Sequence, residues 1–220
     1  VLIERMRKEL GLEVVLTAYG LTECGGLATI CEADDDAETV ALTSGHAIPG
    51  TEVRIVDADN QPLAAGEAGE ICLPGFHVMT GYFVDDHATA AAIDADGWLH
   101  TGDMAKMDAD GFFYIVDRKK DLIIAGGYNI YPREVEEVLM MHPAVLEAAV
   151  VGKPDTDGLT KTKAFVVLKA GAEASEDELK AFVKDRLAPY QYPRFIEFVN
   201  ELPKTATGKI QRVKLREQAA

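Results

Sequence analysis

One stretch of twenty residues, Asp117 to Glu136, restricts the fold of this chain more than any other, because it combines four local signals. Three consecutive cations, residues 118 to 120, follow an apolar predicted strand, where they offer fixed positive charge to an anion such as a phosphate. Gly126-Gly127 lacks Cβ atoms, so the backbone there can take positive φ or approach a thin ligand. Pro132 suits the first turn of a predicted helix, 133–141, because its missing N–H would have no partner there. The stretch therefore predicts a strand end, a charged turn, a glycine break and a helix start.

Three further motifs lie outside this stretch. Tyr19 to Glu23 reads Y-G-L-T-E and follows a predicted buried strand, Val14 to Thr17, at the strand end where open α/β sheets place ligands. Thr101 to Asp103 reads T-G-D and offers a carboxylate able to accept two O–H bonds from a cis-diol. Leu202 to Arg212 reads L-P-K-T-A-T-G-K-I-Q-R. Taken singly, these motifs and the signals above also fit a capped loop, a turn or a solvated basic segment.

In this order along the chain, the motifs resemble those of the adenylate-forming (ANL) superfamily, which includes acyl-CoA synthetases, luciferases and peptide-synthetase adenylation domains. Members use ATP to turn a carboxylate into an acyl-adenylate and then pass the acyl group to a thiol. The resemblance covers Val1 to about Arg216. The chain begins without Met and lacks the Ser/Thr/Gly-rich loop that holds the β- and γ-phosphates in this family. It is therefore expected to be the C-terminal portion of an AMP-dependent acyl-CoA synthetase.

The resemblance implies a nucleotide site in the first half of the chain. Tyr19 would stack on adenine, with Gly20 beside it, Asp103 would bond both ribose hydroxyls, and Arg118 would also bind AMP. An aromatic plane suits a base, and a carboxylate suits a diol.

Three side chains are expected to act on the reacting groups. By resemblance, Thr22 would bond the phosphate or the substrate carboxylate, and Glu23 would hold Mg²⁺, a cation that prefers carboxylate oxygens. Lys209 would reach the α-phosphate and the substrate carboxylate during adenylation. ATP, Mg²⁺ and coenzyme A are the expected cofactor and co-substrates.

A hinge and a coenzyme A path are also implied. Lys120 is the expected pivot, and the glycine break with the residue after it is expected to line the pantetheine path (Gly126, Gly127 and Tyr128). Asn129 stands where many relatives have Arg, and Gln191 replaces a frequent Lys, so the sequence departs from the family pattern at two positions near this path.

Charge is distributed unevenly along the chain, whose net formal charge is −15. Residues 1–117 hold 5 Lys and Arg against 22 Asp and Glu, whereas residues 118–220 hold 17 against 15. An acidic body repels nucleic acid and anionic membranes, so no nucleic-acid partner is expected and a phosphate must be met by local cations.

Three cysteines without a CxxC spacing, no signal peptide and no transmembrane segment favour a cytoplasmic protein with reduced thiols. The sequence leaves the oligomeric state open.

Two domains of α/β and α+β type are expected. Residues 1–117 are predicted to be the end of a large adenylation domain, an α/β edge plus a small distorted β-barrel containing an Ala-rich helix at 86–93. Asp34 to Asp36 is interpreted as a solvated loop, since three adjacent carboxylates cannot converge on one metal. Two Asp-Gly pairs, 96–97 and 110–111, are typical of hairpin turns and do not form a calcium loop.

Residues 118–220 are predicted to form a small, mobile α/β domain. Its elements are helix 133–141, strands 145–151 and 164–168, helix 176–187 and strand 195–199, which make a three-stranded sheet. Ser175 and Glu178 form a capping box for the second helix.

These features predict an AMP-forming acyl-CoA ligase of fatty-acid metabolism or of aromatic acids, whose small domain rotates between adenylation and thioester formation. The alternatives are a peptide-synthetase-type adenylation domain and a catalytically incompetent nucleotide-binding fragment. The 220 residues alone are expected to be inactive. The first half resembles fatty-acid ligases and the segment from Gly158 to Arg216 resembles aryl ligases, so the acid stays open.

Overall fold

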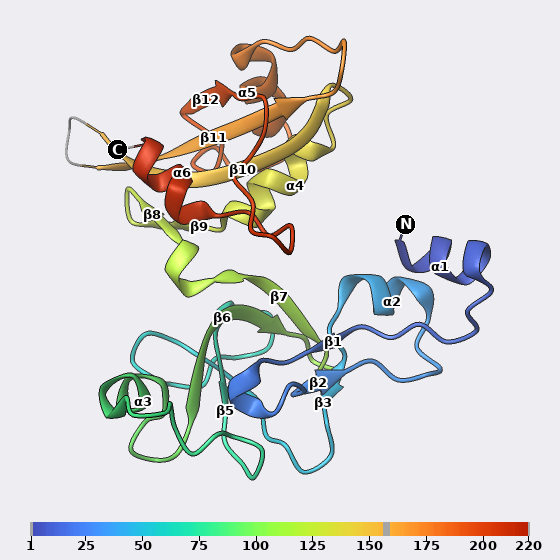
Figure 1. The fold of residues 1–220 in the computed structure, drawn as a ribbon, viewed down its shortest axis with the longest axis vertical. Coiled ribbons are helices and arrows are strands. Elements are labelled where there is room, and N and C mark those ends of the chain that lie inside the picture. The colour runs from blue at the N-terminus through green and yellow to red at the C-terminus, as the bar shows by residue number, and fades with distance from the viewer. Residues whose placement is uncertain (1, 156–158, 220) are drawn as a thin grey trace. The chain divides into compact units, whose positions relative to one another are not determined.

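The computed structural model describes residues 2–155 and 159–219, so Gly158 lies outside the described residues. The chain divides into two compact units, Val1–Lys119 and Lys120–Ala220 (Figure 1). Each unit has its own sheets and its own buried apolar residues, and each is described by itself below. Among the described helices, none combines the length and the apolar character that a bilayer-crossing segment needs.

The first unit begins with a helix and a small antiparallel sheet of order β1-β2-β3. The predicted strand Val14 to Thr17 is wrong, because the strand is Ala18–Tyr19 and its pairing with Ile30 and Thr29 starts only there. Val14 and Leu16 are 51% and 40% exposed, whereas Val15 between them is buried. The elements of this part are α1 (Leu2–Leu10), β1 (Ala18–Tyr19), η1 (Thr22–Cys24), β2 (Thr29–Ile30), α2 (Ala37–Leu42) and β3 (His46–Ala47).

The acidic run at 34–36 serves local backbone hydrogen bonding. The Asp36 carboxylate accepts from the Thr39 amide at 2.8 Å and so caps α2, a helix that the sequence interpretation did not include. The Asp35 carboxylate accepts from the Glu32 amide at 2.7 Å, and Asp34 is exposed. No metal-ligand cluster includes these carboxylates among the described residues.

The rest of the first unit is a four-stranded antiparallel sheet of order β4-β5-β6-β7. Within the described residues this sheet is open: β4 and β7 are its two edges, and β4 is only three residues long. The hairpin turn at 108–111 is confirmed: the Asp108 carboxylate accepts from the amides of Asp110 and Phe112. The elements are β4 (Arg54–Val56), β5 (Gly69–Leu73), α3 (Asp86–Ala92), β6 (Leu99–Met107) and β7 (Phe113–Arg118).

Strand β5 is buried along its whole length, yet its two faces differ in chemistry. Side chains alternate between the faces of a strand. Ile71 and Leu73 therefore pack into the apolar cluster of the first unit, while Glu70 and Cys72 lie on the opposite face. The first unit consequently has an apolar core on one side of the sheet and a buried polar group on the other.

The second unit contains the predicted three-stranded sheet, in which β10 pairs antiparallel with β11 and β11 pairs parallel with β12. Its helices flank this sheet. The capping box is confirmed, since the Glu178 amide donates to Ser175 Oγ and the Ser175 amide to the Glu178 carboxylate. Helix α5 ends earlier than predicted, and α6 was not predicted. The elements are η2 (Lys119–Asp121), β8 (Ile123–Ala125), β9 (Tyr128–Ile130), α4 (Pro132–Met140), β10 (Val145–Pro154), β11 (Thr160–Leu168), α5 (Glu176–Lys184), β12 (Phe195–Phe198) and α6 (Arg212–Ala219).

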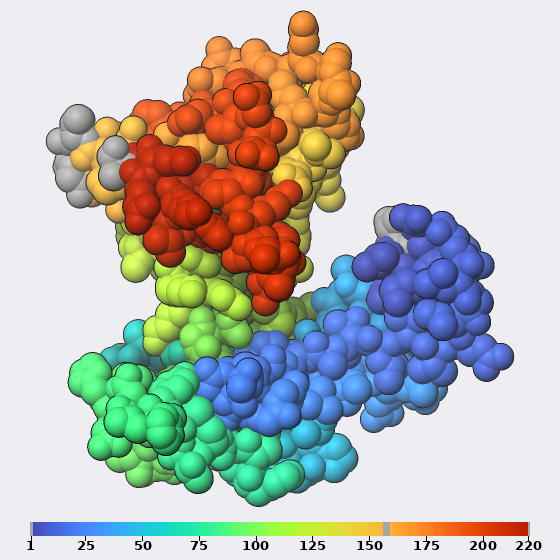
Figure 2. Space-filling view, in the orientation of Figure 1, coloured from blue at the N-terminus to red at the C-terminus, as the bar shows by residue number. Residues whose placement is uncertain are grey.

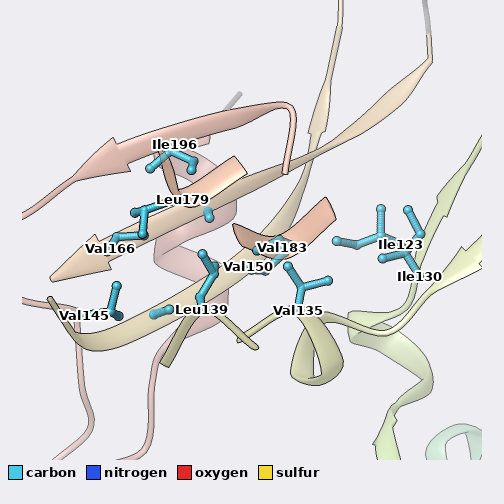
Figure 3. Packing of buried hydrophobic residues seen from close by; sticks show 12 residues of the cluster. Ile123, Ile130, Val135, Leu139, Val145, Val150, Val166, Leu179, Val183 and Ile196 are labelled. Carbon is cyan, nitrogen blue, oxygen red and sulfur yellow. The ribbon is translucent and has the colours of Figure 1, made fainter. Parts of the chain in front are cut away.

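Both faces of this sheet are covered, which the alternation along β10 and β11 explains. One face packs Ala148, Val150, Ala164 and Val166 against α4, α5 and the β8–β9 hairpin (Figure 3). The other face packs Ala149, Val151, Phe165 and Val167 against α6 and the segment before it, through Leu202, Ile210, Leu215 and Ala219. The β8–β9 hairpin and Ile210 therefore lie on opposite faces of one sheet.

Candidate functional site

Three of the predicted nucleotide-binding side chains converge in the first unit. Asp103 on β6 is the direct cross-strand partner of Arg118 on β7, and their side chains form an ion pair with 3.5 Å between Oδ1 and Nε. Tyr19 lies on β1, in a different sheet, and donates its hydroxyl to Asp103 Oδ2 at 2.8 Å. The structure thus brings together an aromatic ring, a carboxylate and a guanidinium that are separated by up to 99 positions in the sequence.

The electrostatics keep the Tyr19 hydroxyl a donor. Burial raises the pKa of Tyr19 far above its ordinary value of 10.0, and the nearby Asp103 charge raises it further, although a hydrogen bond with Thr101 acts in the opposite direction. A phenol that stays protonated donates to Asp103 at every physiological pH. Asp103 is therefore oriented from both sides, by Tyr19 and by Arg118.

Gly20, beside Tyr19, is needed for a close approach of two backbone segments. A Cβ atom at this position would lie 2.2 Å from the Gly26 carbonyl oxygen. The loop after β1 therefore folds tightly against itself, and any larger residue would force it apart.

Thr22 and Glu23 lie next along the chain, on the short 3₁₀ helix η1. Thr22 is exposed, and the Glu23 Oε1 atom accepts a hydrogen bond from the Tyr82 hydroxyl at 2.8 Å. This bond raises the pKa of Tyr82. The sequence interpretation missed Tyr82 as a partner of Glu23, because the two are 59 positions apart and no spacing rule connects them.

The three adjacent cations have three different environments. Arg118 pairs with Asp103, and Lys119 pairs with Glu70 at 2.6 Å. Lys120 lies exposed in η2, and its carbonyl accepts from Arg216 at 3.2 Å. The run does not form one anion site by itself, because two of its members are already paired with carboxylates of the first unit.

The expected coenzyme A residues form a tight hairpin turn in the second unit. Gly126 and Gly127 have φ of 59° and 83°, and a Cβ atom at either position would meet open space. Backbone conformation, rather than close packing, therefore requires glycine here, as in two-residue hairpins with two positive φ values. Tyr128, directly after the turn, stacks on Tyr190 with ring centroids 4.4 Å apart.

The two departures from the family pattern near this hairpin differ in role. Gln191 is buried, donates to the Glu134 carboxylate at 2.7 Å and accepts from the Ala188 amide at 3.1 Å. Asn129 is exposed on β9. Gln191 therefore fixes the 188–191 turn against α4, which a lysine would do with different chemistry.

Lys209 sits on a closed loop of the second unit. The Thr205 amide donates to the Lys209 carbonyl at 2.8 Å, and the Gly208 amide donates to the Thr205 carbonyl at 2.9 Å. Gly208 has φ of 83°, a conformation that favours glycine. The Lys209 ammonium is exposed and has no partner among the described residues, and Figure 2 shows the C-terminal segment on the surface of the second unit.

A buried ion pair anchors the chain just after this loop. Arg212 forms two hydrogen bonds with the Glu136 carboxylate, and Glu136 also accepts from the Val150 amide at 2.7 Å. Glu136 is 6% exposed and lies on α4 between the buried residues Val135 and Leu139. In the sequence Arg212 is recognisable only as the end of a motif. A carboxylate on the apolar face of a predicted helix is the signal that could have identified its partner.

Two family models match the chain. One, described as AMP-binding enzyme, matches residues 1–83, and the other, described as AMP-binding enzyme C-terminal domain, matches residues 134–209. The chain belongs to the AMP-binding enzyme family, of which it represents the C-terminal region.

Curated relatives agree with this assignment. The chain is 48% identical over 99% of its length to a 3-[(3aS,4S,7aS)-7a-methyl-1,5-dioxo-octahydro-1H-inden-4-yl]propanoyl:CoA ligase of Rhodococcus jostii, of which it covers 40%. It is 45% identical over its whole length to a long-chain-fatty-acid–CoA ligase of Salmonella typhimurium, of which it covers 38%. The chain therefore spans about two fifths of the length of the curated relatives it matches.

Solved structures share the fold. The structure of o-succinylbenzoate coenzyme A synthetase (MenE) from Bacillus subtilis in complex with AMP is 38% identical with a TM-score of 0.84, covering 98% of this chain and 43% of that one. ATP-bound MatB from Rhodopseudomonas palustris is 35% identical with a TM-score of 0.86, covering 93% of this chain and 40% of that one.

Proposed function

We propose that this chain is part of an AMP-forming acyl-CoA ligase, in which a carboxylate and ATP give an acyl-adenylate and pyrophosphate, and the thiol of coenzyme A then displaces AMP. The observation that carries the proposal is the convergence of Tyr19, Asp103 and Arg118, a ring, a diol-binding carboxylate and a cation held by one another. This set matches the adenine, ribose and phosphate of AMP in chemistry.

In this proposal Asp103 accepts hydrogen bonds from the ribose hydroxyls, while the Tyr19 ring lies against the base and Arg118 neutralises negative charge nearby. Thr22 bonds the phosphate or the substrate carboxylate through its exposed hydroxyl. Gly20 keeps the loop that carries Tyr19 and Thr22 in its tight conformation. These groups bind and orient the nucleotide, and none of them needs to gain or lose a proton.

Glu23 fits the expected Mg²⁺ site in part. Its Oε1 atom accepts from Tyr82, and in the described residues no donor reaches its Oε2 atom. Mg²⁺ is commonly held by one or two carboxylates together with water and substrate phosphates, so one free carboxylate oxygen is compatible with it. The ion would neutralise phosphate charge when bound.

Lys209 supplies positive charge to the transferred group during adenylation. Its loop packs through Ile210 on the sheet face opposite the β8–β9 hairpin, where Gly126, Gly127 and Tyr128 are proposed to line the pantetheine path. One site cannot meet both faces in the same arrangement, so the second unit is proposed to rotate between the half-reactions. The pivot is Lys120, at the boundary of the two units. In this view residues 1–117 end the large adenylation domain, whose strands complete a distorted barrel, and residues 118–220 are its mobile C-terminal domain.

Only the relatives indicate which carboxylic acid is activated and which thiol accepts the acyl group. Fatty-acid ligases and o-succinylbenzoate coenzyme A synthetase both match, so straight-chain and aromatic acids are both candidate substrates. A peptide-synthetase-type adenylation domain, which passes the acyl group to a different thiol acceptor, is the alternative.

The three free, buried cysteines suit a reducing compartment, which supports a cytoplasmic location.

A second candidate is a nucleotide-binding piece without catalysis, since the chain covers only about 40% of its relatives. The test is acid-dependent ATP–pyrophosphate exchange across a panel of straight-chain and aromatic acids, with the 220-residue chain and a protein extended to the relatives' length measured in parallel. We expect exchange only in the extended protein, and thioester formation on addition of coenzyme A. If the extended protein showed no exchange with any acid of the panel, the proposal would be contradicted. Transfer of the acyl group only to a carrier-protein thiol would favour the peptide-synthetase alternative.

A further inference from the structure

A buried cluster on the polar face of the first unit's sheet is separate from the residues proposed to bind the nucleotide. Glu70 and Cys72 stand two positions apart on β5 and therefore point to the same face, and His100 on β6 is the direct cross-strand partner of Cys72. Each residue offers one possible ligand atom, and these three atoms all lie within 4.8 Å of one another. Glu70 and Cys72 are 4% and 2% exposed. Three neighbouring positions of one sheet thus bring a carboxylate, a thiol and an imidazole together.

The spacing of these atoms agrees with a tetrahedral transition-metal site. His100 Nδ1 lies 3.4 Å from Cys72 Sγ and 3.3 Å from Glu70 Oε2. Ligand atoms at the usual zinc distances in a tetrahedron are separated by roughly 3.4–3.6 Å. Two of the three separations therefore need almost no adjustment.

The surroundings orient these groups as the second layer of a metal site does. His100 Nε2, the ring nitrogen directed away from the cluster, lies 3.5 Å from the Asp94 carboxylate. A carboxylate on the far nitrogen is the usual partner of a metal-bound histidine. The Asp94 carboxylate is itself fixed by the amides of Asp96 and Trp98, and Glu70 Oε1 accepts from the Gly102 amide at 3.0 Å. Glu70 Oε2 is thereby left to face the cluster.

A cation already occupies part of this position. The Lys119 ammonium contacts Glu70 Oε2 at 2.6 Å, and its side chain is 56% exposed whereas that of Glu70 is 5% exposed. The flexible, exposed lysine can withdraw into solvent when a divalent cation arrives.

We propose that Glu70, Cys72 and His100 form a binding site for a thiophilic divalent metal ion, Zn²⁺ being the best fit, with Asp94 orienting His100 and Lys119 competing for Glu70. A sulfur, nitrogen and oxygen donor set favours Zn²⁺ over Mg²⁺ and Ca²⁺. Three protein ligands leave a fourth position for water. Binding converts the Cys72 thiol to a thiolate, and its proton passes to the solvent.

Zn²⁺ affinity should rise with pH, because each bound ion displaces one thiol proton. Lys119, which the ion displaces from Glu70, directly precedes Lys120, the first residue of the second unit.

The first test uses the unaltered 220-residue chain. Titration with Co²⁺ should give one equivalent of bound metal with a thiolate-to-cobalt charge-transfer band in the near ultraviolet, and Zn²⁺ should abolish this band by displacement. X-ray absorption of the zinc form should show one sulfur ligand with nitrogen and oxygen neighbours. No charge-transfer band, or a zinc site without sulfur, overturns the proposal.

Variants locate the site. Zn²⁺ affinity, measured by competition with a chromogenic chelator, should fall more than about 100-fold in Cys72→Ser and about 10- to 100-fold in Asp94→Asn, since partners of metal ligands contribute that much. Cys31→Ser, another buried free cysteine, is the matched control and should leave affinity and spectrum unchanged. Lys119→Ala should raise affinity about fivefold, in keeping with loss of a half-exposed ion pair. Unchanged affinity in folded Cys72→Ser, or a band that vanishes in Cys31→Ser, would place the metal elsewhere.

Discussion

The two units hold their proposed functional charges differently. In the first unit these are the charged groups proposed to bind the nucleotide, and in the second unit it is the lysine proposed to act during adenylation. Asp103 is held by Tyr19 at 2.8 Å and by Arg118 at 3.5 Å, all within one unit. The Lys209 ammonium is exposed, and it has no partner in the described part of the chain. The first arrangement is preorganised, whereas the second presents an unpaired charge on an exposed loop that is closed by backbone hydrogen bonds.

This difference matches two different tasks. A binding group is most effective when its neighbours fix its geometry before the ligand arrives. A group that stabilises charge during one step need not be paired within the protein, but its loop has to hold it in position. This loop is anchored through Lys204 with Glu147 at 2.5 Å and through Arg212 with Glu136.

The largest effect is expected where the anchor of the Lys209 loop is removed. Arg212→Met leaves the 6%-exposed Glu136 carboxylate without its cation. Loss of one member of a buried pair costs about 3–5 kcal/mol of unfolding free energy. Urea unfolding followed by far-ultraviolet circular dichroism should show this loss, while fluorescence of Trp98, the only tryptophan and a residue of the first unit, should not shift.

Lys180→Met is the matched control, because Lys180 pairs with Glu176 on the surface of α5 with i,i+4 spacing. Such pairs contribute about 0.2–0.5 kcal/mol. A shift in Trp98 fluorescence equal to that in circular dichroism would show that the two units unfold together.

The next largest effect concerns the preorganised cluster. Asp103→Asn replaces a charged acceptor by a neutral amide. Hydrogen bonds to charged groups contribute about 1.5–3 kcal/mol, so AMP affinity measured by calorimetry should fall about 10- to 100-fold. Asp110→Asn, on the exposed turn between β6 and β7, should bind AMP as the unaltered protein does. Equal affinity in Asp103→Asn and Asp110→Asn would remove Asp103 from the nucleotide site.

A smaller loss is expected for Tyr19→Phe. The ring is retained and only the hydroxyl that orients Asp103 is lost. Because this hydroxyl acts on the nucleotide only through Asp103, we expect a two- to tenfold loss of AMP affinity, which corresponds to about 0.5–1.5 kcal/mol. A loss as large as that of Asp103→Asn would mean that the hydroxyl contacts the ligand directly, and that the proposed division between orienting and binding groups is wrong.

The smallest effect concerns the pH dependence of stability that the Lys119–Glu70 pair contributes. The pKa of Glu70 lies below its ordinary value of 4.5, chiefly because the bonds from Lys119 and His100 outweigh burial. The stabilisation is therefore present above about pH 4.5 and is lost as the pH falls through the lower, folded-state pKa. Because Lys119 is half exposed, the pair contributes at most about 1 kcal/mol. Glu70→Gln should flatten the acid limb of the stability–pH curve, and an unchanged limb would assign the acid sensitivity to other carboxylates.

The sequence predicted best where local rules decide the structure. Helix α5 could be predicted because Ser175 and Glu178 accept hydrogen bonds from each other's backbone amides. The turn at Gly126-Gly127 could be predicted because two consecutive glycines favour positive φ values, which both adopt. The three-stranded sheet followed from continuous apolar runs in β10 and β11.

Long-range partners could not be read in the same way. The pairs Tyr82–Glu23, Lys119–Glu70 and Arg212–Glu136 join positions 49 to 76 residues apart, and no periodicity connects them. The strand predicted at 14–17 failed because apolar character alone does not supply a pairing partner. Helix α6 has weak amphipathic character, since only Leu215 and Ala219 are buried, so its sequence resembled a solvated basic tail.

The central claim is that Lys209 acts in one half-reaction and is then carried away from the site. The direct measurement is Lys209→Ala in a protein of the relatives' full length, with adenylation and thioester formation from supplied acyl-adenylate followed separately in single turnover. Adenylation should slow about 10²- to 10³-fold, as for the loss of one positioned electrostatic group, and thioester formation should be unchanged. Lys214→Ala, an exposed lysine on α6, should alter neither step. Unchanged adenylation in Lys209→Ala would contradict the catalytic role, and an equal loss in both half-reactions would contradict the rotation of the second unit.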